Sequence, residues 1–132
     1  MSDNSDSTQL HQRLVLGLVD YLKGLDWEVV HVAGVGGYRE PFEIGGYTPD
    51  IIAKRADGLL AVGEAATCDV LSDEKTMKQF TAFSDLSTTN DKREVPFFVV
   101  VPESCGSQLE DIISSKYSSR IQRITRVKMS GV

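Results

Sequence analysis

Two acidic residues, Asp50 and Glu64, flank a short apolar segment that has a turn at its centre. The turn is Ala56-Asp57-Gly58, and a three-residue hairpin loop favours glycine at its last position, where the backbone is left-handed. Counting outward from this loop pairs Ile52 with Val62 and then Asp50 with Glu64. Directly opposed residues of an antiparallel pair have Cβ atoms about 4.5–5.5 Å apart. The sequence therefore predicts that two carboxylates meet on one face of a β-hairpin.

Two carboxylates at that separation repel each other when both are ionised. Either the pKa of one of them rises or a cation binds between them. Mg²⁺ is typically bound through one or two carboxylates together with waters and phosphate oxygens, so Asp50 and Glu64 form a candidate metal site. Two alternatives stay open: the acids lie solvated and unpaired at the end of a sheet, or a two-residue loop shifts the register and places them on opposite faces.

The elements that would position this pair follow from the hydrophobic pattern. Apolar residues recur every three or four positions from Leu10 to Leu22, which predicts a helix with an N-cap at Ser7 or Thr8 and an end near Gly24. We expect residues 1–8 to form a disordered tail and residues 9–132 to form a single domain. The other expected elements are strands over 27–33, 49–55, 59–67, 96–101 and 124–129 and helices over 73–87 and 106–118. This order, αβββαβαβ, indicates an α/β fold.

Composition and charge limit the classes of function. The chain has 132 residues, of which 41% are hydrophobic and 25% charged, as in one globular domain. No apolar run approaches the roughly 18 residues of a membrane-spanning helix, and the N-terminus lacks the pattern of a secretory signal, so we expect no membrane association and a cytoplasmic location. The net charge of −5 disfavours tight nucleic-acid binding unless a divalent cation offsets part of it.

The segment from Pro49-Asp50 through the hairpin to Glu64-Ala65-Ala66 resembles the PD-(D/E)XK nuclease superfamily, and most closely its archaeal Holliday-junction resolvase and Mrr-type restriction branch. The resemblance covers roughly residues 10–102 and implies a restriction endonuclease-like fold, with a mixed central β-sheet flanked by helices. It implies that Asp50, Glu64 and the backbone carbonyl of Ala65 hold Mg²⁺ or Mn²⁺. It also implies hydrolysis of DNA phosphodiesters.

The sequence departs from the family pattern at Ala66, where the family has a lysine. An active enzyme would need that positive charge from elsewhere. Lys54 lies four residues from Asp50 along the strand, a distance on the order of 13 Å, which is too far.

The predicted helix over 73–87 offers other polar groups near the site. On a helical wheel Gln79 borders the apolar face, whereas Lys75 and Lys78 point more nearly to solvent. We expect Gln79 to assist at the site, with Lys78 as the candidate lysine. Gln79 followed by Phe83 also resembles the QxxxY element of the RecB-like branch, with Phe in place of Tyr.

Three arginines are candidate contacts to nucleic acid. Arg39 lies in a glycine-rich loop that the resemblance places beside the site, although the loop is equally well a flexible connector. Arg120 and Arg123 belong to the last 21 residues, which contain five basic residues and no acid. That segment is either a phosphate-facing edge or a solvated surface.

The histidines and cysteines show no such pattern. His11 and His31 stand alone, and we assign neither a role beyond a satisfied structural histidine. Cys68 and Cys105 are far apart and form no CxxC motif, so we expect reduced, packed thiols.

Two functional hypotheses follow from these residues. The first is a magnesium-dependent nuclease or nuclease-like protein that acts on DNA. The second is a module that has the nuclease fold without the lysine and binds nucleic acid or a protein partner in a regulatory or structural role. A homodimer is a further possibility in either case.

Overall fold

The computed structural model describes residues 3–132, with side chains from Thr8 onward. Its main elements occur in the predicted order, αβββαβαβ. They are α1 Asp3–Gly24, β1 Glu28–Val32, β2 Ile51–Lys54, β3 Leu60–Ala65, α2 Glu74–Phe83, β4 Phe97–Pro102, α3 Gly106–Lys116 and β5 Ile124–Met129, with short 3-10 turns η1 Cys68–Val70, η2 Glu103–Cys105 and η3 Ser118–Arg123. None of the helices described is long and apolar enough to cross a membrane.

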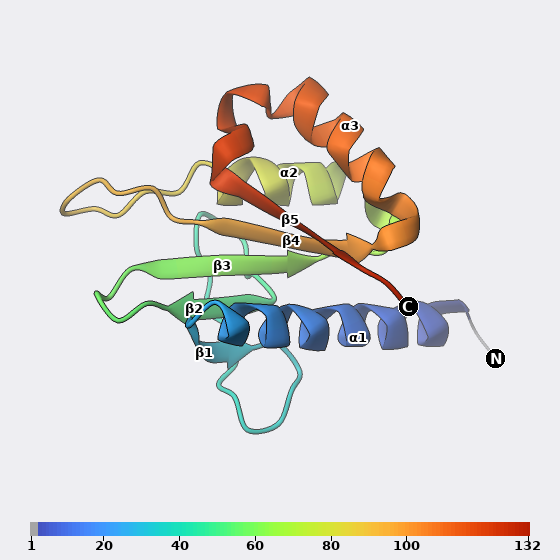
Figure 1. Ribbon diagram of the computed structural model, residues 1–132, viewed down its shortest axis with the longest axis horizontal. Helices are drawn as coiled ribbons and strands as arrows, with labels where there is room; N and C mark the ends of the chain where they lie inside the picture. Colours follow the sequence, from blue (N-terminus) through green and yellow to red (C-terminus); the bar gives the residue numbers. More distant parts are fainter. Residues whose placement is uncertain (1–2) are drawn as a thin grey trace.

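The strands form one mixed sheet in the order β1-β2-β3-β4-β5. β2 pairs antiparallel with β1 and β3, whereas β3, β4 and β5 run parallel to one another. α1 lies against one face of the sheet, and α2 and α3 lie against the other (Figure 1). The protein is therefore an α/β protein with a central mixed sheet covered on both faces.

Two apolar clusters hold these layers together. Under α1, the helix residues Leu14 and Leu18 pack with Ile51 of β2 and Val100 of β4. Under α2 and α3, a second cluster includes Phe80, Leu109, Val62 and Val99. Val62 belongs to the cluster under α2, whereas its neighbour Ala61 belongs to the one under α1. Successive side chains of β3 therefore point to opposite faces of the sheet.

The predicted register of the central hairpin is confirmed. The Arg55 amide donates to the Leu59 carbonyl at 2.9 Å, and Gly58 takes the left-handed conformation with φ of 91°. Ile52 pairs with Val62, as counted from the sequence. The length and backbone geometry of a three-residue loop determine which residues oppose each other on the two strands, so the turn alone was enough to predict the pairing.

Two boundaries differ from the sequence-based expectation. α1 begins at Asp3, so residues 3–8 are helical rather than part of a disordered tail, and Met1 and Ser2 lie outside the described residues. Once the segment from Leu10 onward has nucleated a helix, extension through residues without Gly or Pro costs little free energy. α2 ends at Phe83, earlier than the predicted end at residue 87.

The expectation of reduced thiols is wrong for this structure. Cys68 and Cys105 form a disulfide, with their Cα atoms 5.7 Å apart. Ala65 pairs with Val100 across the parallel strands β3 and β4, so the turns that follow these strands lie at the same end of the sheet. Parallel pairing thus brings together two cysteines that are 37 residues apart in the sequence.

Candidate functional site

The predicted acidic pair lies where the hairpin leaves the sheet. Asp50 directly precedes β2, and Glu64 is the next-to-last residue of β3. The ladder between β2 and β3 ends with the pair Ile51 and Gly63, so Asp50 and Glu64 come next in register. Glu64 has the same parity as Val62, which packs under α2. Both acids therefore lie at the α2 face, near the end of the central strand.

Each acid accepts a hydrogen bond from the main chain of the other strand. The Asp50 amide donates to Glu64 Oε1 at 2.8 Å, and the Ala65 amide donates to Asp50 Oδ2 at 2.9 Å. These two bonds fix the carboxylates side by side. Asp50 Oδ1 and Glu64 Oε2 accept no hydrogen bond from the described residues, so each acid retains one oxygen for a ligand.

Burial makes this arrangement electrostatically costly. Glu64 is only 7% exposed. Burial raises the pKa of the Glu64 carboxyl well above its ordinary value, and the negative charge of Asp50 raises it further. The Asp50 amide and the more distant Lys75 ammonium act in the opposite direction, with smaller effects. The site thus favours either a proton on Glu64 or a cation next to it.

His11 is a member of the site that the sequence-based prediction missed. Its Nε2 atom lies 3.2 Å from Asp50 Oδ2. The hydrogen bond to Asp50 raises the pKa of the His11 imidazole, while partial burial acts in the opposite direction. A signal was present in the sequence: His11 lies on the apolar face of α1, one turn before Leu14 and Val15, which are fully buried.

A cavity of about 280 Å³ opens at the acid pair. Asp50, Glu64 and His11 line it together with Lys75 and Gln79 from α2. Gln79 therefore borders the site, as predicted. Lys75 does too, although we expected it to point to solvent; helical side chains lean toward the helix N-terminus, and Lys75 is the second residue of α2.

The candidate lysine Lys78 is not brought to this cavity. Its ammonium pairs with Glu74 one turn back, at 3.1 Å, and its side chain is 61% exposed. Ala66, at the position of the family's lysine, is buried and lines the cavity wall. Lys75 is thus the lysine that α2 presents next to the acids.

The three arginines predicted to contact nucleic acid lie apart from the cavity. Arg39 is exposed in the loop between β1 and β2, where its carbonyl accepts from the Val32 amide at 3.0 Å. Arg120 contacts Ser84 and Asp85 beyond the other end of α2. Arg123 donates to the Leu86 carbonyl and pairs with Glu94 at 3.5 Å. Arg120 and Arg123 are therefore already engaged in holding the segment after α2.

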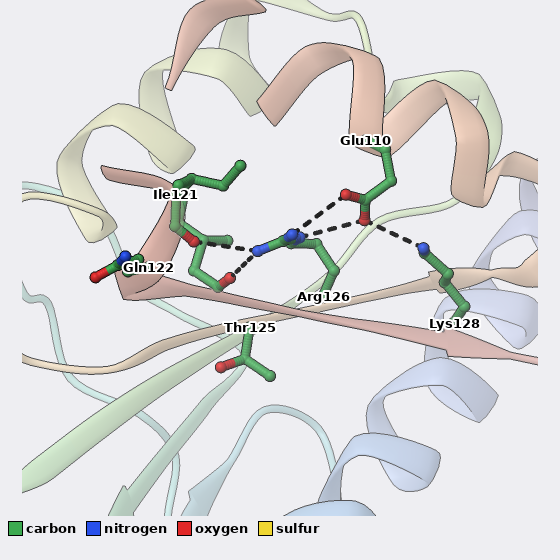
Figure 2. A pocket seen from close by; sticks show the side chains of 7 residues that line it. Glu110, Ile121, Gln122, Thr125, Arg126 and Lys128 are labelled. Atoms are coloured by element: carbon green, nitrogen blue, oxygen red, sulfur yellow. Dashed lines mark hydrogen bonds and ion pairs between the residues drawn. The ribbon is translucent and has the colours of Figure 1, made fainter. Parts of the chain in front are cut away.

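A larger cavity, of about 800 Å³, lies beside β5 and has different chemistry. Figure 2 shows Glu110 of α3 reaching toward Arg126 and Lys128 of β5. The guanidinium of Arg126 also donates to the carbonyls of Ile121 and Ile124, at 3.1 and 2.7 Å. Glu110 pairs with both of these cations, and among the described residues that line this cavity no buried side-chain atom lacks a hydrogen-bond partner.

The donor set at the acid pair suits a hard divalent cation. Carboxylate oxygens are the ligands preferred by Mg²⁺ and Mn²⁺, and the pKa of Glu64 is raised first by burial and then by the negative charge of Asp50. Among the described residues, no group of three or more His, Cys, Asp or Glu side chains is arranged to hold a metal ion. Magnesium sites commonly use one or two carboxylates and several waters rather than a closed protein cage, so the pair fits such an ion.

Comparisons with protein-family models, with characterised proteins and with solved structures find no significant match for this chain. Assignment of a function therefore depends on the geometry and chemistry of the acid pair and the cavity around it.

Proposed function

We propose that the protein is a divalent-metal-dependent nuclease of restriction endonuclease-like fold, with DNA as its expected substrate. The observation that carries the proposal is a pair of main-chain hydrogen bonds, from the Asp50 amide to Glu64 and from the Ala65 amide to Asp50, which hold two carboxylates together with one free oxygen each. The order of the elements and the acid pair on the central hairpin also agree with the resemblance described for the sequence.

Asp50 and Glu64 would hold Mg²⁺ or Mn²⁺, with the Ala65 carbonyl as the third ligand that the resemblance implies. When bound, such an ion polarises phosphoryl oxygens, lowers the pKa of water and offsets developing charge. The two main-chain amides keep both carboxylates oriented before the ion arrives, so little rearrangement is needed.

Lys75 supplies the positive charge that Ala66 cannot. Its ammonium comes from α2 to the same cavity, where it stabilises negative charge on Glu64 and would do the same for a phosphate. Gln79, one turn further along α2, offers an amide to the same space. In this proposal a helix provides the cation that the family pattern places on β3.

Metal titration and cleavage of DNA test the proposal. Calorimetry with Mn²⁺ is expected to show binding by the unchanged chain and none by Asp50→Asn. With Mn²⁺ and branched, single-stranded and duplex DNA, Lys75→Ala is expected to lower the cleavage rate about 10²-fold. Lys78→Ala is the matched control, since its exposed ion pair contributes little, and should change the rate by less than about twofold. Absence of Mn²⁺ binding, or cleavage unaffected by Asp50→Asn, would overturn the proposal.

A second candidate, a non-catalytic module that binds nucleic acid or a protein partner, is favoured by one observation. Ala66 is 2% exposed and carries no group that acts on a phosphate. Salt-sensitive DNA binding without cleavage would support this module. Binding of neither DNA nor Mn²⁺ would favour a protein partner, with a homodimer detected by measuring the mass in solution.

A further inference from the structure

The first turn of α2 leaves three main-chain amides without an acceptor. The bonding of the helix begins with the Met77 amide, which donates to the Asp73 carbonyl at 3.0 Å, so the amides of residues 74–76 precede the hydrogen-bonded turns. Among the described residues, none of these three amides has an acceptor. Asp73 occupies the N-cap position, but its carboxylate makes no capping bond. Free N–H groups and the helix dipole both favour negative charge at such a terminus.

Thr76 provides an independent indication that a ligand binds beside this terminus. The residue is 8% exposed, hence more than nine-tenths buried, and it lines the cavity of the acid pair. Its hydroxyl has no hydrogen-bond partner within the described part of the chain. Two unpartnered side-chain atoms there are sealed from solvent, both in arginines, so the Thr76 oxygen remains reachable from the cavity. A buried hydroxyl without a partner costs free energy, and an acceptor oxygen of a ligand would satisfy it.

The charged side chains of this turn add a free cation to the same place. Glu74 pairs with Lys78 at 3.1 Å and does not line the cavity. Lys75 lines the cavity and takes part in no salt bridge between described residues. An ammonium and a main-chain amide act only as donors, and a hydroxyl can donate as well. The turn therefore presents a set of donors that suits a ligand made of acceptor oxygens.

We propose that the first turn of α2 binds a phosphate group of the nucleic-acid substrate, through the Thr76 hydroxyl, the Lys75 ammonium and the amides of residues 74–76. The inference rests on the proposed function, which supplies the identity of the substrate. A phosphate group presents several acceptor oxygens, so it can accept from the helix terminus and from both side chains at once. Bound there, it lies in the same cavity as Asp50 and Glu64, and α2 positions the substrate backbone beside the two acids.

Binding of phosphate-containing probes by the full chain tests this without cleavage. The probes are inorganic phosphate and a single-stranded thymidine tetranucleotide, added with a chelator to the Asp50→Asn chain, which has one negative charge fewer in the cavity. In ¹H–¹⁵N NMR spectra, the amides of residues 74–76 are expected to shift with either probe. Thr76→Val should raise the dissociation constant about tenfold, because a hydrogen bond to a charged group is lost. Thr76→Ser should restore binding, and Thr81→Val, on α2 but outside the cavity, is the matched control and should retain it.

The outcomes separate this inference from the function beneath it. If no amide of residues 74–76 shifts, or if Thr76→Val binds the probes unchanged, the phosphate site is overturned even where Mn²⁺ binds and DNA is cleaved. Phosphate binding that depends on Thr76, without Mn²⁺ binding by the unchanged chain, overturns the nuclease and supports the phosphate site. Thermal unfolding gives a second measurement: Thr76→Val removes an unsatisfied buried hydroxyl, so its Tm should equal or exceed that of the unchanged chain. A lower Tm would overturn the inference, because it would show that the hydroxyl already has a partner within the protein.

Discussion

Glu64→Gln is expected to stabilise the protein in the absence of divalent cations. Glu64 is 7% exposed, and its pKa is raised by burial and then by Asp50. Glutamine keeps an oxygen to accept the Asp50 amide, which Glu64 Oε1 now accepts at 2.8 Å, and it carries no charge. The variant removes the cost of a buried acid without removing the bond that orients it.

The magnitude follows from the cost of burying an incompletely satisfied carboxylate. That cost is on the order of 1–3 kcal/mol in proteins. For a chain of 132 residues, 1 kcal/mol corresponds to a change of about 3–5 °C in Tm. Thermal unfolding followed by circular dichroism at pH 8 with a chelator should therefore give a Tm about 3–15 °C higher for Glu64→Gln than for the unchanged chain.

The difference should depend on pH in a defined direction. The pKa of Glu64 is higher in the folded than in the unfolded state, so the folded state retains a proton that the unfolded state has lost. The stability of the unchanged chain therefore falls as pH rises from the unfolded value of about 4.3 through the raised folded value. Below pH 4 the two chains should have the same free energy of unfolding, because the other titrating groups affect both chains equally.

Divalent cations should make the unchanged chain more stable than Glu64→Gln. Mn²⁺ at about 100 times its dissociation constant adds about 2.7 kcal/mol to a chain that binds it, and Glu64→Gln is expected to bind it poorly. Glu103→Gln, at an exposed acid outside the cavity, is the matched control and should behave like the unchanged chain. A Tm of Glu64→Gln equal to or below that of the unchanged chain at pH 8, with chelator present, would refute the reasoning.

Three further predictions concern the scaffold of the site. In Gly63→Ala the new Cβ would lie 2.9 Å from Leu18 Cδ2 and 3.3 Å from Ile51 Cβ. Urea unfolding should therefore show a free energy of unfolding lower by about 1–3 kcal/mol. An unchanged midpoint would contradict the close packing of α1 on β3. Reduction of the Cys68–Cys105 disulfide should lower the free energy of unfolding by up to about 4 kcal/mol, because the bond closes a loop of 37 residues and so limits the entropy of the unfolded chain. Without reductant, mass spectrometry after alkylation should find no alkylated thiol. Two alkylated thiols would show that the bond does not form. Arg126→Ala removes the donor to the carbonyls of Ile121 in η3 and of Ile124 at the start of edge strand β5, seen in Figure 2. Light scattering should then show a mass that increases with concentration beyond that of the unchanged chain. Lys116→Ala is an exposed control, and equal masses would contradict the edge-protecting role.

Local patterns in the sequence were sufficient to predict the elements and the central hairpin. A three-residue loop closed by Gly58 sets which residues oppose each other, and each added pair follows from the period of two. For this reason the proximity of Asp50 and Glu64 followed from counting alone. The apolar period of α1 likewise predicted the helix over its central turns, although not its start at Asp3, because helix ends depend on weaker signals.

The tertiary structure alone decided which other groups reach the acid pair. His11 is 39 residues from Asp50 in the sequence, and their contact depends on where α1 crosses the sheet. Lys75 enters the cavity, whereas Lys78, one turn later on α2, pairs with Glu74, a choice set by the position of α2 over the end of β3. The Cys68–Cys105 bond requires the parallel pairing of β3 with β4. Periodicity and turn chemistry act between near neighbours in the chain, whereas these contacts depend on how whole elements pack, which no local pattern encodes.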